Sequence, residues 1–166
     1  MSRAFVKEND LEHAGIDVPE RPVSAHPNYV TPAGLQQLEA EADRLEKERL
    51  AQKQLQLTEP LARQKIAMID RDLRYIGARL ANAILVAHQL PASDAAVVFG
   101  AKVTVEDEEG ALHTFTIVGE DEADMASNKV SYISPIAKAL IGRKVGDTVE
   151  WQRPIGNMQL TITAIE

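Results

Sequence analysis

The stretch 62–87, ARQKIAMIDRDLRYIGARLANAILVA, decides the fold of this chain of 166 residues. Apolar side chains recur in it at alternating steps of four and three residues, which is typical of a coiled-coil seam rather than of a globular helix face. The seam consists of Ala62, Ile66, Ile69, Leu73, Ile76, Leu80, Ala83 and Ala87. The stretch therefore predicts a long helix that packs against a partner helix.

The partner helix is expected just upstream, folded back antiparallel. Thr31-Pro32 is a helix start, because threonine is a good N-cap and proline is tolerated at the first helical position. Its apolar repeat weakens from Arg49 onward. Thr58-Glu59-Pro60 repeats the start signal, so a turn is predicted near residues 55–59, and Pro91 is expected to end the second helix. The charges between the seam positions of the second helix are interpreted as a solvated face; they include Arg63, Lys65, Asp70, Arg71, Asp72, Arg74 and Arg79.

The sequence pattern changes near residue 97, where short runs rich in β-forming residues are separated by glycine-containing turns. Runs at 102–106 and 112–118 flank a polar turn, and further strands are predicted near 129–133, 148–151 and 159–165. Ser134-Pro135 opens a short helix through Leu140, again as a cap followed by a first-turn proline. We predict an α+β chain with three parts: a tail at 1–28, a helical hairpin at 29–91 and an antiparallel-sheet domain at 97–166.

Composition limits the class of protein. The formal net charge is −7, which argues against a surface built to bind free nucleic acid. There is no cysteine, so disulfide, thiolate-zinc and cysteine-nucleophile chemistry is excluded. No apolar run is long enough to span a membrane, and the first 30 residues lack the apolar core of a signal peptide. We expect a soluble, cytoplasmic protein with no membrane partner.

Catalytic and cofactor motifs are missing from the sequence. The four histidines lie in unrelated contexts, and there is no phosphate loop, dinucleotide fingerprint or nucleophile elbow. The acidic cluster 120–124 lacks the spacing of a calcium loop and is interpreted as an exposed loop or a protein-docking edge. We therefore expect no enzyme activity, no metal and no cofactor.

Several linked strings resemble one family. Val98-Phe99-Gly100-Ala101, then residues 114–119, Asp121-Glu122, residues 134–140 and 144–149 are similar, in order and nearly in spacing, to the C-terminal signature of the bacterial Gre transcription elongation factors. Residues 29–35 and 69–76 resemble the GreB branch. The resemblance covers residues 29–166 apart from the hairpin tip, and it implies a coiled-coil hairpin followed by a small FKBP-like domain with one short helix.

The resemblance also implies a partner. In that family the C-terminal domain docks on the rim of the secondary channel of RNA polymerase core, and the coiled coil extends toward the active site. The implied partner-binding residues are Asp121, Glu122, Ile133, Ser134, Pro135, Ala137 and Leu140. DNA and RNA are then met only through the transcription complex, and the chain is expected to be a monomer.

The hairpin tip departs from the family pattern. Cleavage-stimulating members carry an acidic string there, which helps to hold a magnesium ion at the polymerase active site. Here the tip is Leu57, Thr58, Glu59 and Pro60, and Glu59 is the one carboxylate between Arg49 and Ile69. Relative to the family the arm is also shorter by about six residues per helix, which withdraws the tip by on the order of 9 Å.

We therefore expect a Gre-like factor that binds polymerase and regulates elongation with little or no cleavage stimulation of its own. Three alternatives stay open. The chain is a true cleavage stimulator with a remodelled tip that acts through Glu59; or its FKBP-like domain is a prolyl isomerase; or the seam is used by a coiled-coil adaptor that dimerises.

Overall fold

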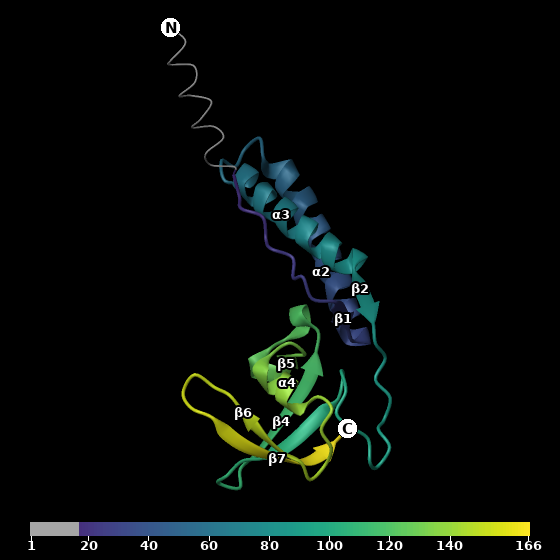
Figure 1. Ribbon diagram of the computed structural model, residues 1–166. Coiled ribbons are helices and arrows are strands. Elements are labelled where there is room, and N and C mark those ends of the chain that lie inside the picture. The colour runs from purple at the N-terminus through teal and green to yellow at the C-terminus, as the bar shows by residue number, and fades with distance from the viewer. Residues whose placement is uncertain (1–16) are drawn as a thin grey trace. The chain divides into compact units, whose positions relative to one another are not determined.

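A computed structural model describes residues 17–166, and the first sixteen residues of the predicted tail lie outside the described part. Figure 1 shows a helical hairpin and a curled sheet. In chain order the elements are β1 (Asn28–Val30), α2 (Pro32–Leu55), α3 (Ala62–Ala81), β2 (Ala83–Leu85), β3 (Lys102–Glu106), β4 (Leu112–Val118), η1 (Glu120–Glu122), η2 (Met125–Ser127), β5 (Lys129–Ser131), α4 (Pro135–Leu140), β6 (Thr148–Trp151) and β7 (Met158–Ile165). The α+β class is confirmed.

The hairpin forms as its apolar repeat predicts. Helices α2 and α3 lie side by side (Figure 1), and Arg49 on α2 donates to the Asp70 carboxylate on α3 at 2.5 Å. Seam residues Ala62, Ile69 and Ile76 are buried. Arg79 is buried as well, so its interpretation as a solvated charge is wrong. Arg79 is 1% exposed, so its whole side chain, including the guanidinium, lies inside.

The ends of α3 differ from the prediction. The helix begins at Ala62 rather than at Pro60, and the Thr58 hydroxyl donates to the Leu55 carbonyl, so Thr58 closes α2 instead of opening α3. The helix ends at Ala81, ten residues before Pro91. The β-prone run that follows it forms strand β2, whose backbone pairing replaces the helical bonds that the seam pattern alone predicts.

Strands β1 and β2 form a parallel pair that joins the two ends of the hairpin. Asn28 pairs with Ala83 and Val30 with Leu85, and the Val86 amide donates to the Val30 carbonyl at 2.9 Å. Gly119 lies against this pair, because a Cβ there would stand 2.3 Å from the Tyr29 carbonyl oxygen. The sequence pattern did not predict this small sheet, since three-residue strands are too short to show a period.

The main sheet has the order β5-β4-β3-β7-β6. Its β3–β4, β3–β7 and β6–β7 pairs are antiparallel, as predicted, but β4 and β5 run parallel. The wholly antiparallel sheet is therefore wrong at this edge. After β4 the chain crosses back through the turns η1 and η2, so β5 enters the sheet in the direction of β4.

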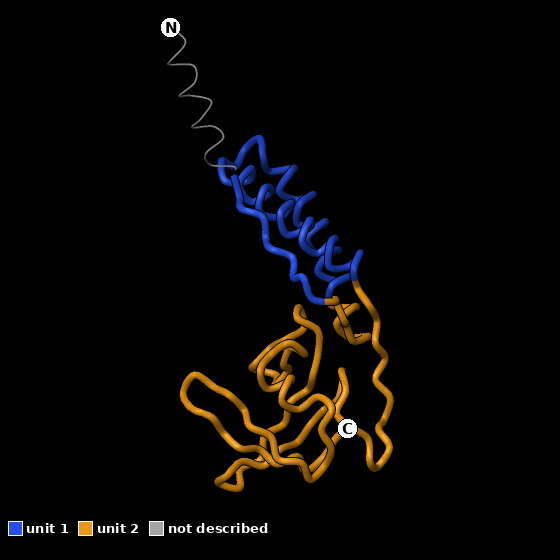
Figure 2. Tube along the Cα trace, viewed as in Figure 1, with its two compact units in different colours: residues 1–26, 38–82 blue, residues 27–37, 83–166 orange. Residues whose placement is uncertain are grey.

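The core of the sheet domain lies between the sheet and α4, and it includes Val103, Ile117, Leu140, Leu160 and Ile162. By backbone proximity the chain divides into two compact units (Figure 2). The described part of the first is 17–26 with 38–82, and the second is 27–37 with 83–166. The β1–β2 pair and the first turns of α2 thus belong with the sheet domain. No helix within residues 17–166 is long and apolar enough to cross a membrane.

Candidate functional site

The predicted docking residues centre on the start of α4. The Ser134 hydroxyl accepts the Ala137 amide at 3.3 Å and Pro135 occupies the first turn, so the predicted cap is confirmed. This cap holds Ser134 half-buried and leaves Pro135 exposed at the surface. Both residues are therefore fixed in position by the local backbone.

Two hollows meet at Pro135. The larger has a volume of about 690 Å³ and is mostly apolar, and the smaller measures about 440 Å³. Residues that line the larger hollow include Phe115, Met125, Ser134, Trp151 and Ile155. The smaller is lined by Ile133, Pro135, Lys138, Ala139, Glu150 and Gln152. Pro135 also lines the larger hollow, so it forms a ridge between two concave surfaces.

The walls of the larger hollow include residues that the motif comparison missed. Trp151 packs edge-on against Phe115 with ring centroids 5.5 Å apart, and the Arg153 guanidinium lies over the indole at 5.2 Å. Met125 and Ile155 are exposed by 70% and 85%, so they present apolar surface to solvent beside the hollow. An isoleucine beside Pro154 in a polar stretch is a sequence signal that could have indicated this hollow.

The other predicted docking residues divide between surface and interior. Asp121 is exposed and Ile133 is half-buried. Ala137 and Leu140 belong to the core with no exposed area. A partner cannot reach these two side chains in this conformation, and their role is to hold α4 against the sheet.

Glu122 is also buried, and its carboxylate contacts the residues at the start of α2. The Thr31 hydroxyl donates to it, with oxygen–oxygen distances of 2.6 and 2.8 Å to the two carboxylate oxygens, and accepts the Gly34 amide at 3.0 Å. A Cβ on Gly34 would stand 2.5 Å from Glu122 Oε2, so a larger residue at this position would force the carboxylate to shift. A negative charge at a helix N-terminus is favourable, because the first amides of the helix point toward it.

The hairpin tip is apolar and poor in carboxylates. Leu57 and Leu61 are exposed by 92% and 62%, and the tip carboxylate is that of Glu59. Within residues 17–166 no group of three or more histidine or acidic side chains is placed to hold a metal ion. A single carboxylate is weak support for magnesium, which prefers several oxygen ligands in octahedral geometry.

Comparisons with known proteins point to one family. Residues 92–166 match the family described as Transcription elongation factor, GreA/GreB, C-term. The chain is 34% identical to the transcription elongation factor GreB of Haemophilus ducreyi over 154 residues, covering 85% of this chain and 94% of the relative. It is 41% identical to the elongation factor GreA of Thioalkalivibrio sulfidiphilus over 106 residues, covering 63% and 67%.

Among solved structures, the chain is similar to the GreA factor homologue Gfh1 of Thermus thermophilus. The identity is 26%, the TM-score is 0.41, and the match covers 85% of this chain and 99% of that one. The level of identity to GreB over nearly its whole length decides the family. The chain belongs to the GreA/GreB family of transcription elongation factors.

Proposed function

We propose that this Gre-family factor binds RNA polymerase core at the rim of the secondary channel and regulates transcript elongation with little or no cleavage stimulation of its own. The binding surface is the exposed ridge at Pro135 with the hollows on either side of it, flanked by Ile133, Ser134 and Asp121. Ala137, Leu140 and Glu122 contribute from below, by fixing α4 and the η1 turn.

The shape at Pro135 is the observation that carries this proposal. A rigid proline between two concave surfaces, one of them lined by exposed Met125 and Ile155, is suited to an apolar face of a protein partner. The segment 91–166 as a whole is acidic, since it carries six basic and twelve acidic side chains. A basic partner helix therefore gains both apolar contact and charge-steered association.

The weak cleavage activity is inferred from the tip. Metal-assisted hydrolysis requires oxygen ligands that hold the second cation and orient water. Glu59 alone, between exposed leucines, supplies one such side chain. The factor would then act by occupying the channel or by competing with true cleavage factors.

Titration of labelled protein onto core polymerase, with an authentic Gre factor as unlabelled competitor, tests the binding. We expect saturable binding that the competitor displaces. Ile155→Ser should weaken it by about tenfold, because an exposed apolar contact is lost. Leu112→Ser is the matched control, since Leu112 is 65% exposed and lines neither hollow. Equal affinities for the two variants, or no binding at micromolar concentration, would contradict the proposed surface.

A transcript-shortening assay on backtracked complexes tests the tip. We expect the wild-type chain and Glu59→Ala to leave the transcript at its background length. Shortening by the wild type that Glu59→Ala abolishes would instead support the remodelled-tip alternative.

We also infer that the factor acts as a monomer. The seam residues Ala62, Ile69 and Ile76 are buried within the chain, so they are not exposed for the intermolecular seam of an adaptor. Sedimentation at increasing concentration should give a constant monomer mass. A mass that rises with concentration would instead support the alternative of a coiled-coil adaptor that dimerises.

The larger hollow favours one second candidate. Its Phe115 and Trp151 give an aromatic-lined apolar wall, which is what a prolyl isomerase needs to receive a proline ring. A peptide isomerisation assay at catalytic concentration decides this point. An isomerisation rate equal to the uncatalysed background would exclude the prolyl isomerase function.

A further inference from the structure

The segment 17–26, here called the strap, runs in extended form along α3 (Figure 1). Glu20 forms a paired ion contact with Arg74, in which Nε and Nη2 of the arginine each donate to a carboxylate oxygen. Arg21 donates to the Asp72 carboxylate at 3.3 Å, and its guanidinium lies 3.8 Å from the centroid of the Tyr75 ring. Two consecutive strap residues therefore contact three residues of α3, namely Asp72, Arg74 and Tyr75, which lie within about one helical turn.

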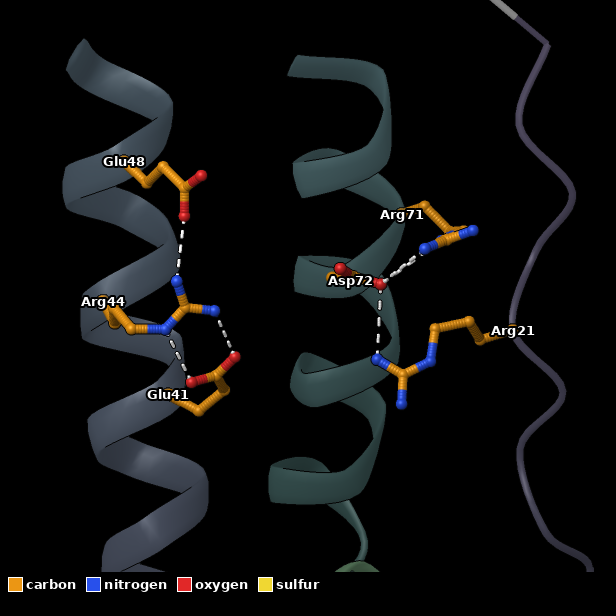
Figure 3. A network of polar contacts seen from close by, with 6 residues as sticks. All are labelled: Arg21, Glu41, Arg44, Glu48, Arg71 and Asp72. Carbon is orange, nitrogen blue, oxygen red and sulfur yellow. Dashed lines mark hydrogen bonds and ion pairs between the residues drawn. The ribbon is translucent and has the colours of Figure 1, made fainter. Parts of the chain in front are cut away.

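Arg21 is the centre of these contacts. Figure 3 shows its side chain reaching from the strap to Asp72, whose carboxylate also accepts from Arg71 at 3.1 Å. The pKa of Glu41 on α2 is lowered chiefly by the hydrogen bond from Arg44, and the positive charge of Arg21 contributes least. The hydrogen bond and the ring contact of Arg21 are both made to α3.

The hairpin beneath the strap has a thin apolar interior. On α2 only Leu38 and Leu45 are buried hydrophobics, and the repeat then meets Arg49. On α3 Met68 is 43% exposed although it lies near the middle of the hairpin. Short helical hairpins in water depend on such packing, so additional contacts to one of the helices have a large relative effect.

We propose that residues 17–26 are a releasable strap that stabilises helix α3 through Arg21, and that ionic strength sets how firmly the strap is held. The strap is held by solvent-exposed ion pairs and one cation–ring contact. The side chains of Glu20 and Arg74 are exposed by 62% and 55%. Pairs of this kind are screened by salt, unlike the buried seam. Release leaves the sheet domain and its docking surface intact, so this device is separate from the function proposed above.

Amide hydrogen exchange on the full chain tests the strap. In Arg21→Ala the amides of residues 71–76 should exchange about fivefold faster than in the wild type, because an ion pair and a cation–ring contact are both lost. Glu20→Gln should produce a smaller increase in the same segment. Unchanged exchange at 71–76 in Arg21→Ala would overturn the proposal.

Arg44→Ala is the matched control. Arg44 also contacts carboxylates, those of Glu41 and Glu48, but all of them lie within α2 (Figure 3). Its loss should change exchange only around residues 41–48. Equal acceleration at 71–76 in both arginine variants would mean that Arg21 holds no special place, which contradicts the strap.

Salt provides the second measurement. Raising the ionic strength from about 0.01 M to 1 M shortens the screening length from roughly 30 Å to 3 Å. Exchange at 71–76 should accelerate with salt in the wild type and change little in Arg21→Ala. Equal salt dependence in the two proteins would overturn the proposal. Polymerase affinity should be the same for both proteins at a given salt concentration, so the docking proposal is tested separately.

Discussion

Thr31 and Glu122 are 91 positions apart in the chain, and the Thr31 hydroxyl donates to the Glu122 carboxylate at 2.6 Å. The same hydroxyl accepts the Gly34 amide, so one oxygen both caps α2 and binds a buried carboxylate of the sheet domain. The first turn of the long helix is therefore built on the domain that follows the hairpin in sequence.

Thr31→Val should lower the free energy of unfolding by about 2–4 kcal/mol. The loss combines an N-cap, worth about 1 kcal/mol, with a buried carboxylate left without its donor, which costs about 1–3 kcal/mol. Urea unfolding measures it. Thr58→Val is the control, because Thr58 is exposed and bonds only to the Leu55 carbonyl. A similar small loss in both variants would contradict the coupling.

Two glycine substitutions should have opposite effects. In Gly119→Ala the new Cβ meets the Tyr29 carbonyl oxygen at 2.3 Å, so the β1–β2 pair must shift, at a cost of about 1–3 kcal/mol. In Gly77→Ala, within α3, nothing lies within 4 Å of the new Cβ, and alanine's helix preference should add about 0.5–1 kcal/mol. Thermal unfolding of the two variants should move the midpoint in opposite directions; a shift of the same sign would be inconsistent with this packing.

Acid should weaken the β3–β4 hairpin through Asp107. The hydrogen bond from the His113 ring, and then those from the Ala111 and Glu109 amides, lower the pKa of Asp107 from 3.8. A carboxyl with a lowered folded pKa contributes stability above its unfolded pKa and loses it as the pH falls through the folded value. Between about pH 5 and pH 1 the wild type should therefore lose more stability than Asp107→Asn. Parallel curves of unfolding free energy against pH would refute this assignment.

Leu140→Ala should lower the free energy of unfolding by about 2–5 kcal/mol, because Leu140 is fully buried beneath α4. Chemical denaturation followed by Trp151 fluorescence measures the loss. Leu57→Ala, at a leucine that is 92% exposed, should change the midpoint very little. An unchanged free energy of unfolding in Leu140→Ala would argue against the core role given to this residue.

Periodicity and capping predicted the parts of the fold that repeat or that carry a start signal. The seam from Ala62 to Leu80 and the cap at Ser134 are local patterns, so they can be read from neighbouring residues. The parallel β1–β2 pair and the parallel entry of β5 depend on contacts between distant segments, which no local period records. For the same reason the apolar repeat predicted a helix that continues past Ala81. In the structure the helix ends there, and the following residues pair with β1.

The candidate site shows the same division. Ser134 is half-buried and Pro135 is exposed, whereas the Glu122 carboxylate faces Thr31, because a motif says nothing about which way a side chain points. Met125 and Ile155 were not predicted, since they come from two loops that only the folded sheet brings to one hollow.

The place of β7 in the sheet bears on how the chain is made. This strand lies between β3 and β6 and supplies Leu160 and Ile162 to the core, yet it follows both of its neighbours in the chain. A ribosome that has delivered residues up to 150 has delivered both helices and most of the sheet's strands, but the strand that joins β3 to β6 is still missing. The helical hairpin has its own short-range contacts at that stage, whereas the sheet domain waits for residues 158–165 before its interior closes, and a nascent chain paused there exposes an unpaired β3 edge.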